Sequence, residues 1–171
     1  MRLVVWQRSI LPEKIATLDH LIERKKSVSE MLVELCQQAR VDDIEIIKSI
    51  GGVRDVTASS FLAELGDCDR FTSYKKLIAF AGLDPSIHKS GKYEGKSRIS
   101  KRGNRHLRRI IYMMTSCIVR KNNTFREYFL KKKLQGLSYK EAVIATSQKL
   151  IRVIYAMLSS RTPYREVMHN S

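Results

Sequence analysis

Residues 44 to 66, IEIIKSIGGVRDVTASSFLAELG, have the pattern of two short helices joined by a tight turn. Apolar residues recur at helical spacing on both sides of Gly51-Gly52, and glycine lets the chain reverse its direction there. The chain of 171 residues contains only 8 Gly and 3 Pro, so the residues that usually separate strands are scarce. The sequence therefore predicts an all-α domain that includes this helical hairpin.

The hairpin resembles the helix-hairpin-helix motif, in which turn amides and the start of the second helix hold a DNA phosphate. Gly52 lies in the turn, but Arg54 stands where the motif would have a second glycine. An arginine at this position can itself contact a phosphate. A hairpin with a purely structural role is the other interpretation, and both stay open.

Residues 1–43 precede the hairpin, and within them residues 13–39 have the pattern of a long amphipathic helix. This helix is either a coiled-coil arm that makes a homo-oligomer or a helix that lies on its own domain, because Lys25 and Ser29 interrupt the apolar stripe. The apolar positions that define the stripe are Ile15, Leu18, Ile22, Val28, Leu32 and Leu35.

Three further helices are expected after the hairpin. A short one runs from Ser73 to Ala81 and ends at Gly82. A second begins with Ser100 as its cap, and a third follows the capping box Ser138-Tyr139-Lys140-Glu141. The chain from Ser159 onward is expected to fray. In the second helix one face is apolar and the opposite face basic, with Leu107, Ile111, Met114 and Ile118 on the first and Arg102, Arg105, Arg109 and Tyr112 on the second.

The net charge of +15 is concentrated in one part of the chain. Residues 89 to 133 contain 15 basic residues against Glu94 and Glu127, a net charge of +13. Such a concentration favours a polyanionic partner, DNA or RNA, over a merely solvated face. An anionic membrane is the competing partner, but no apolar run of 18 residues and no signal peptide appear. We therefore expect a soluble, cytoplasmic protein that does not bind membrane.

Metal-ligand spacing is absent from this sequence. Cys36, Cys68 and Cys117 lie far apart and form no CxxC or Cys/His pattern. Glu64 and Asp67 are interpreted as surface charge around a helix end. We expect no metal site and no cofactor within this chain.

Residues 86 to 102, SIHKSGKYEGKSRISKR, have no helical stripe and are expected to form an irregular basic loop, with a short hairpin inside it as an open alternative. Ser90 precedes Gly91 in this loop, where the chain can turn sharply. A serine hydroxyl attacks phosphorus only when a base or a polarising environment activates it, and cations neutralise the growing charge. Ser90 is therefore a candidate nucleophile, although it is also one of several loop serines. The cations that flank it are Lys89, Lys92, Lys96, Arg98, Lys101 and Arg102.

The region from about residue 50 to 158 resembles the C-terminal domain of the IS110 family of bacterial insertion-sequence transposases. The resemblance rests on LAELGD, FTSYKKLIAFAGLDP, Ser90-Gly91 and ISKRGNRHLRR, in that order and spacing. It implies a DNA recombinase that works with a bridge RNA, in which a RuvC-like domain binds metal through four acidic residues. The family's nucleophilic serine corresponds to Ser90.

The resemblance also assigns a basic signature to DNA-backbone contacts and helix initiation. Only about fifty residues precede the matching region, too few for the metal-binding domain. We therefore expect a DNA-binding domain at 44–160 with a tail at 161–171, inactive alone, while Mg²⁺ is expected in a missing N-terminal domain. A non-catalytic DNA- or RNA-binding module, or a transposase remnant, is the alternative. The signature residues are Ser100, Lys101, Arg102, Gly103, Asn104, Arg105, Leu107 and Arg108, and Arg109 is added to the expected DNA contacts.

Overall fold

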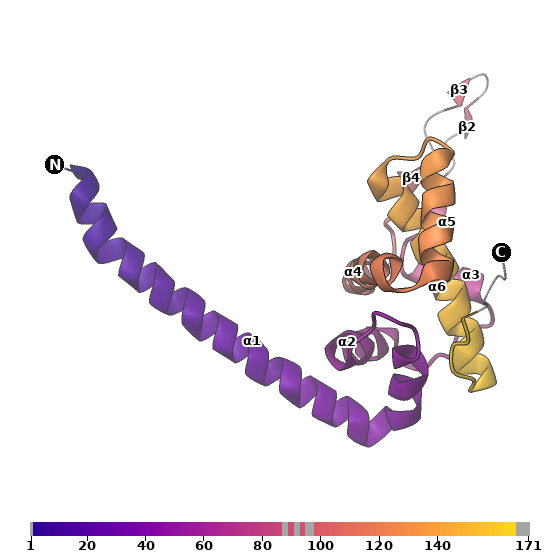
Figure 1. Cartoon of the computed structure of the whole chain (residues 1–171), viewed down its shortest axis with the longest axis horizontal. Coiled ribbons are helices and arrows are strands. Elements are labelled where there is room, and N and C mark those ends of the chain that lie inside the picture. Colours follow the sequence, from indigo (N-terminus) through magenta and orange to yellow (C-terminus); the bar gives the residue numbers. More distant parts are fainter. Residues whose placement is uncertain (1, 87–88, 91–92, 95–97, 167–171) are drawn as a thin grey trace.

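The computed structural model describes residues 2–86, 89–90, 93–94 and 98–166, with side chains from 10 to 85 and from 99 to 166. Over these residues the fold is helical, as expected (Figure 1). The only strands among them are four segments of two residues. The helices are α1 (Arg2–Lys48), α2 (Asp55–Leu65), α3 (Tyr74–Phe80), α4 (Arg105–Lys121), α5 (Asn123–Leu134) and α6 (Tyr139–Ser160).

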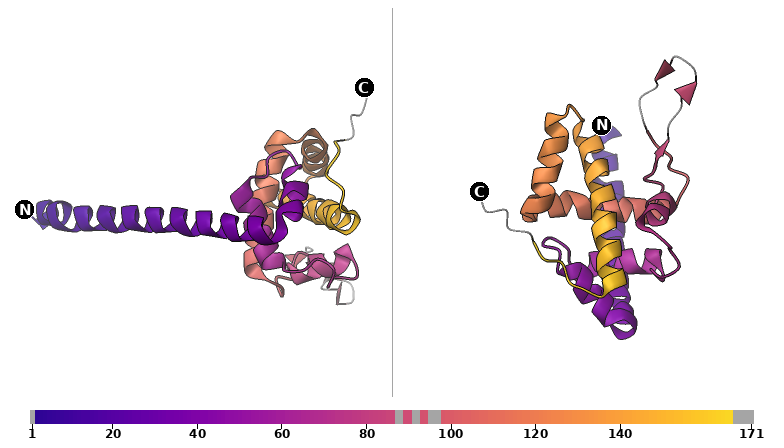
Figure 2. Two further views of the ribbon diagram at one scale, coloured as in Figure 1. Left: turned by 90° about the horizontal axis from the view of Figure 1, so that it is seen from below. Right: turned by 90° about the vertical axis from the view of Figure 1, so that its right-hand side faces the viewer.

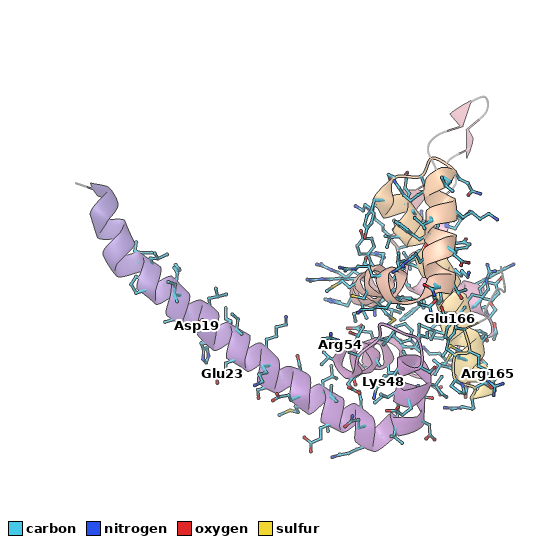
Figure 3. All side chains as sticks on the ribbon, viewed as in Figure 1. Asp19, Glu23, Lys48, Arg54, Arg165 and Glu166 are labelled. Carbon is cyan, nitrogen blue, oxygen red and sulfur yellow. The ribbon has the colours of Figure 1, made fainter. Side chains whose placement is uncertain are left out.

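Helix α1 is kinked at Arg40, whose backbone angles of −149° and 44° are not helical. Beyond the kink, Ile44 and Ile47 are fully buried in the core. Before it, the helix projects as a long arm from the helical body, as Figures 1 and 2 show. Leu18 is 55% exposed and Leu35 is 58% exposed, so the arm does not lie on its own domain. In Figure 3 Asp19 and Glu23 lie on this arm, far from the helical body.

The kink is held by a pair of arginines around one buried carboxylate. Arg40 Nε donates to Asp43 Oδ2 over 2.8 Å, and Arg40 also donates to the carbonyl oxygen of Gly66 over 2.7 Å. Arg161, directly after α6, forms an ion pair with the other oxygen of Asp43. A buried carboxylate is costly unless it is paired, so this network stabilises the junction between the arm and the body.

The core lies where α2 and α6 pack on α4, and the end of α1 packs on α2 and α6 (Figure 2). The predicted apolar face of α4 is confirmed, because its four residues are at most 1% exposed. Complete burial of such a side chain contributes roughly 1.5–3 kcal/mol, so this face anchors α4 firmly. The four residues are Leu107, Ile111, Met114 and Ile118.

The predicted capping box at the start of α6 is also confirmed. The Ser138 amide donates to Glu141 Oε2 over 2.9 Å, and Ser138 Oγ accepts from the Glu141 amide over 3.4 Å. This reciprocal pair satisfies amides that would otherwise lack partners. It therefore begins α6 at Tyr139.

The expectation of fraying from Ser159 onward is wrong as far as Glu166. The Tyr164 amide donates to Ser49 Oγ over 2.7 Å, which ties the segment after α6 to the hairpin between α1 and α2. Glu166 Oε1 accepts from the Asn123 amide over 2.8 Å, at the start of α5, and Figure 3 labels this residue. A carboxylate is favoured there because the first amides of a helix lack intrahelical partners.

The basic segment between α3 and α4 contains two short antiparallel pairings, in agreement with the alternative of a short hairpin within the loop. Strand β1 (Pro85–Ser86) pairs antiparallel with β4 (Arg98–Ile99). Farther along the same segment, β2 (Lys89–Ser90) pairs antiparallel with β3 (Tyr93–Glu94). We call these two ladders the ribbon. The sequence pattern did not predict their number or positions, because two-residue strands are too short to show an alternation of apolar and polar residues.

Candidate nucleic-acid interface

Ser90 lies on the outer ladder of the ribbon, where its backbone is paired with that of Tyr93. In Figure 2 this ladder stands beyond the helical body, away from the core. Lys89 belongs to the same ladder, and Arg98 belongs to the inner ladder next to the body. Three expected nucleic-acid contacts, Gly91, Lys92 and Lys96, lie outside the described residues.

The inner end of the ribbon is tied together by hydrogen bonds between its two sides. The Ser100 amide donates to the Asp84 carbonyl over 2.9 Å, and Ser100 Oγ donates to Asp84 Oδ1 over 2.5 Å. The Lys101 amide donates to the carbonyl oxygen of Gly82 over 3.1 Å. Gly82 has a φ of +65°, the left-handed conformation expected for a residue that ends a helix, here α3.

Asn104 caps α4, so the prediction that Ser100 is the cap is wrong. Asn104 Oδ1 accepts from the amides of His106 and Leu107 over 2.9 and 3.0 Å. Ser100 is engaged by Asp84, and the chain then turns through Lys101, whose φ is +57°. Asparagine caps a helix as well as serine does, so cap preference alone does not distinguish position 100 from position 104.

Glu64 has a role that sequence reasoning missed. Its Oε2 accepts a hydrogen bond of 2.8 Å from Asn104 Nδ2, which links α2 to the start of α4. Glu64 is half-buried, so the interpretation as plain surface charge is wrong. The two residues are 40 positions apart, and no local spacing could indicate this contact.

The arginines of the basic signature fall into two groups. Arg108 is half-buried and donates from its guanidinium to the Ala81 carbonyl over 2.9 Å, so it joins α4 to the end of α3. Arg102, Arg105 and Arg109 are exposed. None of these three forms a salt bridge with a carboxylate whose side chain the structure describes. They are therefore available to phosphates, whereas Arg108 is committed to the fold.

The hairpin before α2 packs on the last turn of α4. Gly52 has a φ of +105°, and a Cβ there would lie 3.2 Å from Lys121 Cβ and 3.3 Å from Ile118 Cα. Arg54 has a φ of −118°, a conformation open to any residue, which explains why glycine is not required at this position. Arg54 is exposed beside the start of α2, and Figure 3 shows it near Lys48.

Lys48 and Asp55 fasten the two ends of this hairpin. Lys48 Nζ lies 2.8 Å from Asp55 Oδ1, and this bond lowers the pKa of the Asp55 carboxyl below its ordinary value. The same contact raises the pKa of Lys48. Arg54 is therefore left as the unpaired cation of the hairpin among the side chains that the structure describes.

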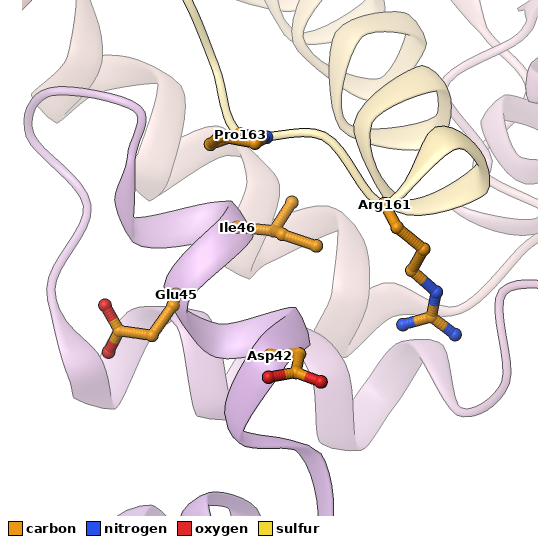
Figure 4. A pocket seen from close by; sticks show the side chains of 5 residues that line it. All are labelled: Asp42, Glu45, Ile46, Arg161 and Pro163. Atoms are coloured by element: carbon orange, nitrogen blue, oxygen red, sulfur yellow. The ribbon is translucent and has the colours of Figure 1, made fainter.

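A hollow of about 620 Å³ lies beside the kink of α1, between the last turns of α1 and the segment that follows α6 (Figure 4). It is wide open, and Asp42, Glu45 and Arg161 line it together with Ile46 and Pro163. Among the described residues, no group of three or more His, Cys, Asp or Glu could hold a metal ion. Its acidic lining makes this hollow unsuited to nucleic acid.

The described helices include none that is long and apolar enough to cross a membrane. The N-terminal arm is the longest, but charged residues such as Asp19 and Glu23 recur along it. The exposed side of α4 carries positive charge, and the arm carries charges of both signs.

Comparison with known proteins identifies the family. Residues 44–130 match the model described as the Transposase IS116/IS110/IS902 family. The chain is 31% identical over 163 residues to the insertion element IS116 uncharacterized 44.8 kDa protein of Streptomyces clavuligerus, with 91% of this chain and 41% of that protein covered. It is 33% identical over 149 residues to the transposase for insertion sequence element IS1111A of Coxiella burnetii, with 85% and 41% covered.

A pilin gene-inverting protein of Moraxella bovis is 27% identical over 126 residues, which cover 72% of this chain and 39% of that protein. The chain thus spans about two fifths of the length of each of these curated relatives. The matched region includes the hairpin, the ribbon and α4, so the similarity falls on the elements described above. The chain belongs to the IS116/IS110/IS902 family of transposases.

Proposed function

We propose that this chain is the part of a transposase that binds DNA and supplies Ser90 as the nucleophile for strand exchange. One observation carries the proposal: the ladder with Ser90 projects from the body on a ribbon, and that ribbon joins an arginine-bearing helix. A projecting ribbon can reach a phosphodiester that the flat surface of a helical domain could not approach. The basic helix beside it holds the same strand.

The proposed reaction is a transesterification. The Ser90 hydroxyl oxygen attacks the phosphorus of a DNA phosphodiester, and a phosphoserine ester forms while one bond between phosphorus and deoxyribose oxygen breaks. The leaving oxygen takes up a proton, equivalent to the one that the serine hydroxyl loses. Attack by a hydroxyl of another strand reverses these bond changes and frees Ser90, so no oxidant or energy source is required.

Arg102, Arg105 and Arg109 are proposed to hold the DNA backbone next to the ribbon. All three are exposed and free of salt bridges to described carboxylates, so no internal bond must break before they bind phosphate. Arg54 is a further phosphate contact at the start of α2, in the manner of a helix-hairpin-helix motif. The same cations can bind the backbone of a guide RNA.

The Mg²⁺ expected for this family is not assigned to the described residues, which contain no suitable group of ligands. Its ligands are proposed to lie in a RuvC-like domain outside this chain, and no step above depends on it here. The activity of this chain is therefore proposed to require that domain.

The arm of α1 is proposed to pair with the arm of a second copy. Leu11, Ile15, Leu18 and Ile22 follow the alternating four- and three-residue spacing of a coiled coil, and each is at least 50% exposed. An isolated helix with such an apolar stripe gains stability by burying it against an identical partner. A homodimer would bring two ribbons to one DNA site.

The test of the nucleophile uses DNA with a nicked or strained strand, bridge RNA, and the metal-binding domain of a relative supplied in trans. Wild type is expected to give a protein-DNA adduct that survives denaturation, and Ser90→Ala is expected to give none while DNA affinity is unchanged. Ser86→Ala is the matched control, since it changes another serine of the ribbon. An adduct that persists in Ser90→Ala rejects the proposal.

A non-catalytic nucleic-acid-binding module is the second candidate. The exposed side chains of Arg105 and Arg109 favour it, because they can bind phosphates whether or not Ser90 reacts. If this candidate is correct, neither wild type nor Ser90→Ala forms an adduct when the metal-binding domain and bridge RNA are added, and both bind DNA with equal affinity. The adduct experiment therefore separates the two candidates.

A further inference from the structure

We propose that Glu64 and Asn104 are positioning residues that set the direction of the ribbon and thereby the place of Ser90. The inference rests on the proposed role of Ser90 and extends it to residues on α2 and at the start of α4. The two residues are bonded to each other at the base of the ribbon, so both would act through the junction there.

Asn104 holds the returning side of the ribbon, the segment that leads from β4 into α4, through three hydrogen-bonding groups. Its amide donates to the Phe80 carbonyl over 2.6 Å, its Oδ1 caps α4, and its Nδ2 donates to Glu64 Oε2 over 2.8 Å. One residue thus connects the ends of α3 and α2 with the beginning of α4. A displacement of any of these helices would move the point where the ribbon re-enters the body.

The outgoing side of the ribbon, the segment that leads from α3 into β1, is held by side chains of α4 and α6. Arg108 of α4 donates to the Ala81 carbonyl over 2.9 Å, and Gln148 of α6 donates to the Leu83 carbonyl over 2.6 Å. Both sides of the ribbon are therefore bonded to the helical body within a few residues of strands β1 and β4.

The two sides are also in backbone contact, so the junction has little room to deform. A Cβ built on Gly103 would lie 2.0 Å from the Phe80 carbonyl oxygen and 2.6 Å from the amide nitrogen of Gly82. No real side chain fits at such distances. Close-packed structure of this kind transmits a displacement along the chain instead of absorbing it.

The bond to Glu64 is additional to what helix capping requires. Asn104 Oδ1 alone satisfies the amides of His106 and Leu107, and asparagine would cap α4 without any partner on α2. The Nδ2 bond instead adds a charge-assisted hydrogen bond across two helices at a half-buried site. Its effect is to fix the angle between α2 and the base of the ribbon.

Asn104→Asp separates positioning from capping. The new carboxylate still accepts from the two helix amides, but it cannot donate to Glu64 and repels its carboxylate. Glu64→Gln alone keeps an oxygen that accepts from Asn104, so it serves as the conservative control. The double variant N104D/E64Q restores the bond with donor and acceptor exchanged, because the glutamine amide can donate to the new carboxylate.

The direction of the ribbon is measured as a distance distribution between two spin labels in the intact chain. One label uses Cys117, which is naturally exposed on α4, and the other uses Glu94→Cys on β3. Cys36→Ala removes the half-buried thiol, and the buried Cys68 remains unlabelled. Circular dichroism verifies that each variant is folded.

The expected result is a broadened or shifted distance distribution in N104D, a distribution like wild type in E64Q, and recovery in the double variant. In the complemented adduct assay, N104D should lose about 10- to 100-fold in adduct yield, since small misplacements of a reacting group have effects of this size. The adduct yield is expressed per DNA-bound protein, with binding measured separately for each variant, and the double variant, which has the same net charge as wild type, should recover the yield. If N104D acted only by destabilising the fold, its melting temperature would fall, and the double variant would not restore the distance distribution and the adduct yield together.

Two results overturn the inference. An unchanged distribution in N104D shows that the pair does not direct the ribbon. A broadened distribution with full adduct yield in N104D shows that adduct formation by Ser90 does not depend on the direction of the ribbon. If no protein gives a Ser90-dependent adduct, the proposed function fails, and the distance distributions then decide by themselves whether the pair holds the ribbon.

Discussion

Arg108 donates a hydrogen bond to the carbonyl oxygen of Ala81 over 2.9 Å and so joins α4 to the end of α3. Arg105 and Arg109, on either side of it in the sequence, are exposed and make no such bond to the fold. Neighbouring arginines of this basic region therefore differ in their contacts with the fold. One belongs to the junction at the base of the ribbon, and the others face outward.

This difference predicts opposite effects of two alanine substitutions. Arg105→Ala should reduce the slope of log affinity for DNA against log salt by about one and leave stability unchanged. Arg108→Ala should leave that slope unchanged and destabilise the fold by about 1–3 kcal/mol, because the Ala81 carbonyl loses its partner. Salt titrations and denaturant unfolding of both variants measure the two effects. Equal salt slopes for wild type and Arg105→Ala would remove Arg105 from the interface.

The two glycines of the hairpin should differ in their tolerance of alanine. Gly52→Ala should destabilise the protein by about 1–3 kcal/mol, because its φ of +105° disfavours a side chain and its Cβ would press on α4. Gly51→Ala is the control, since the nearest atom to a Cβ there is 3.8 Å away. Thermal unfolding of both variants tests the contact between hairpin and α4, and equal loss of stability would contradict it.

The ion pair between Lys48 and Asp55 should stabilise the hairpin in a defined pH range. Since the pKa of Asp55 is lowered in the folded state, this contribution is present above the ordinary pKa of 3.8 and is lost as the pH falls through the lowered value. The raised pKa of Lys48 means that its contribution is lost only as the pH rises through a value above 10.5.

Asp55→Asn should therefore lower the melting temperature near pH 7, with the difference from wild type vanishing as the pH falls below the lowered pKa of Asp55. A double-mutant cycle with Lys48→Met isolates the coupling between the two side chains. A coupling of zero near pH 7 would show that this ion pair contributes nothing to stability.

Substitution on the apolar stripe of the arm should change the mass in solution. Leu18→Glu places a charge on the proposed coiled-coil face and should convert a dimer into a monomer, because burying that carboxylate is costly. Ala16→Glu, on the opposite side of the helix, is the matched control and should stay dimeric. Light scattering over a range of concentrations measures the mass. A monomeric wild type would reject pairing of the arms.

Local patterns predicted the helices well where one rule applied without competition. The capping box of Ser138 and Glu141 and the apolar face of α4 were both found as expected, since each depends on spacing within a few turns. The position of the α4 cap was not found, because Ser100 and Asn104 are equally suitable from sequence alone. Asp84 decides between the two positions, because it accepts a hydrogen bond from the Ser100 hydroxyl across the base of the ribbon.

The sequence by itself determined the helical class, the family and the local concentration of positive charge, because periodicity, motifs and composition are properties of the chain alone. Only the tertiary structure decided which of these charged side chains are bonded to the fold and which are exposed. It assigned Arg108 to the fold and left Arg105 exposed, and it joined Glu64 to Asn104 across 40 residues. The physical reason is that burial and hydrogen-bond partners arise when distant helices pack, and no spacing along one helix contains that information.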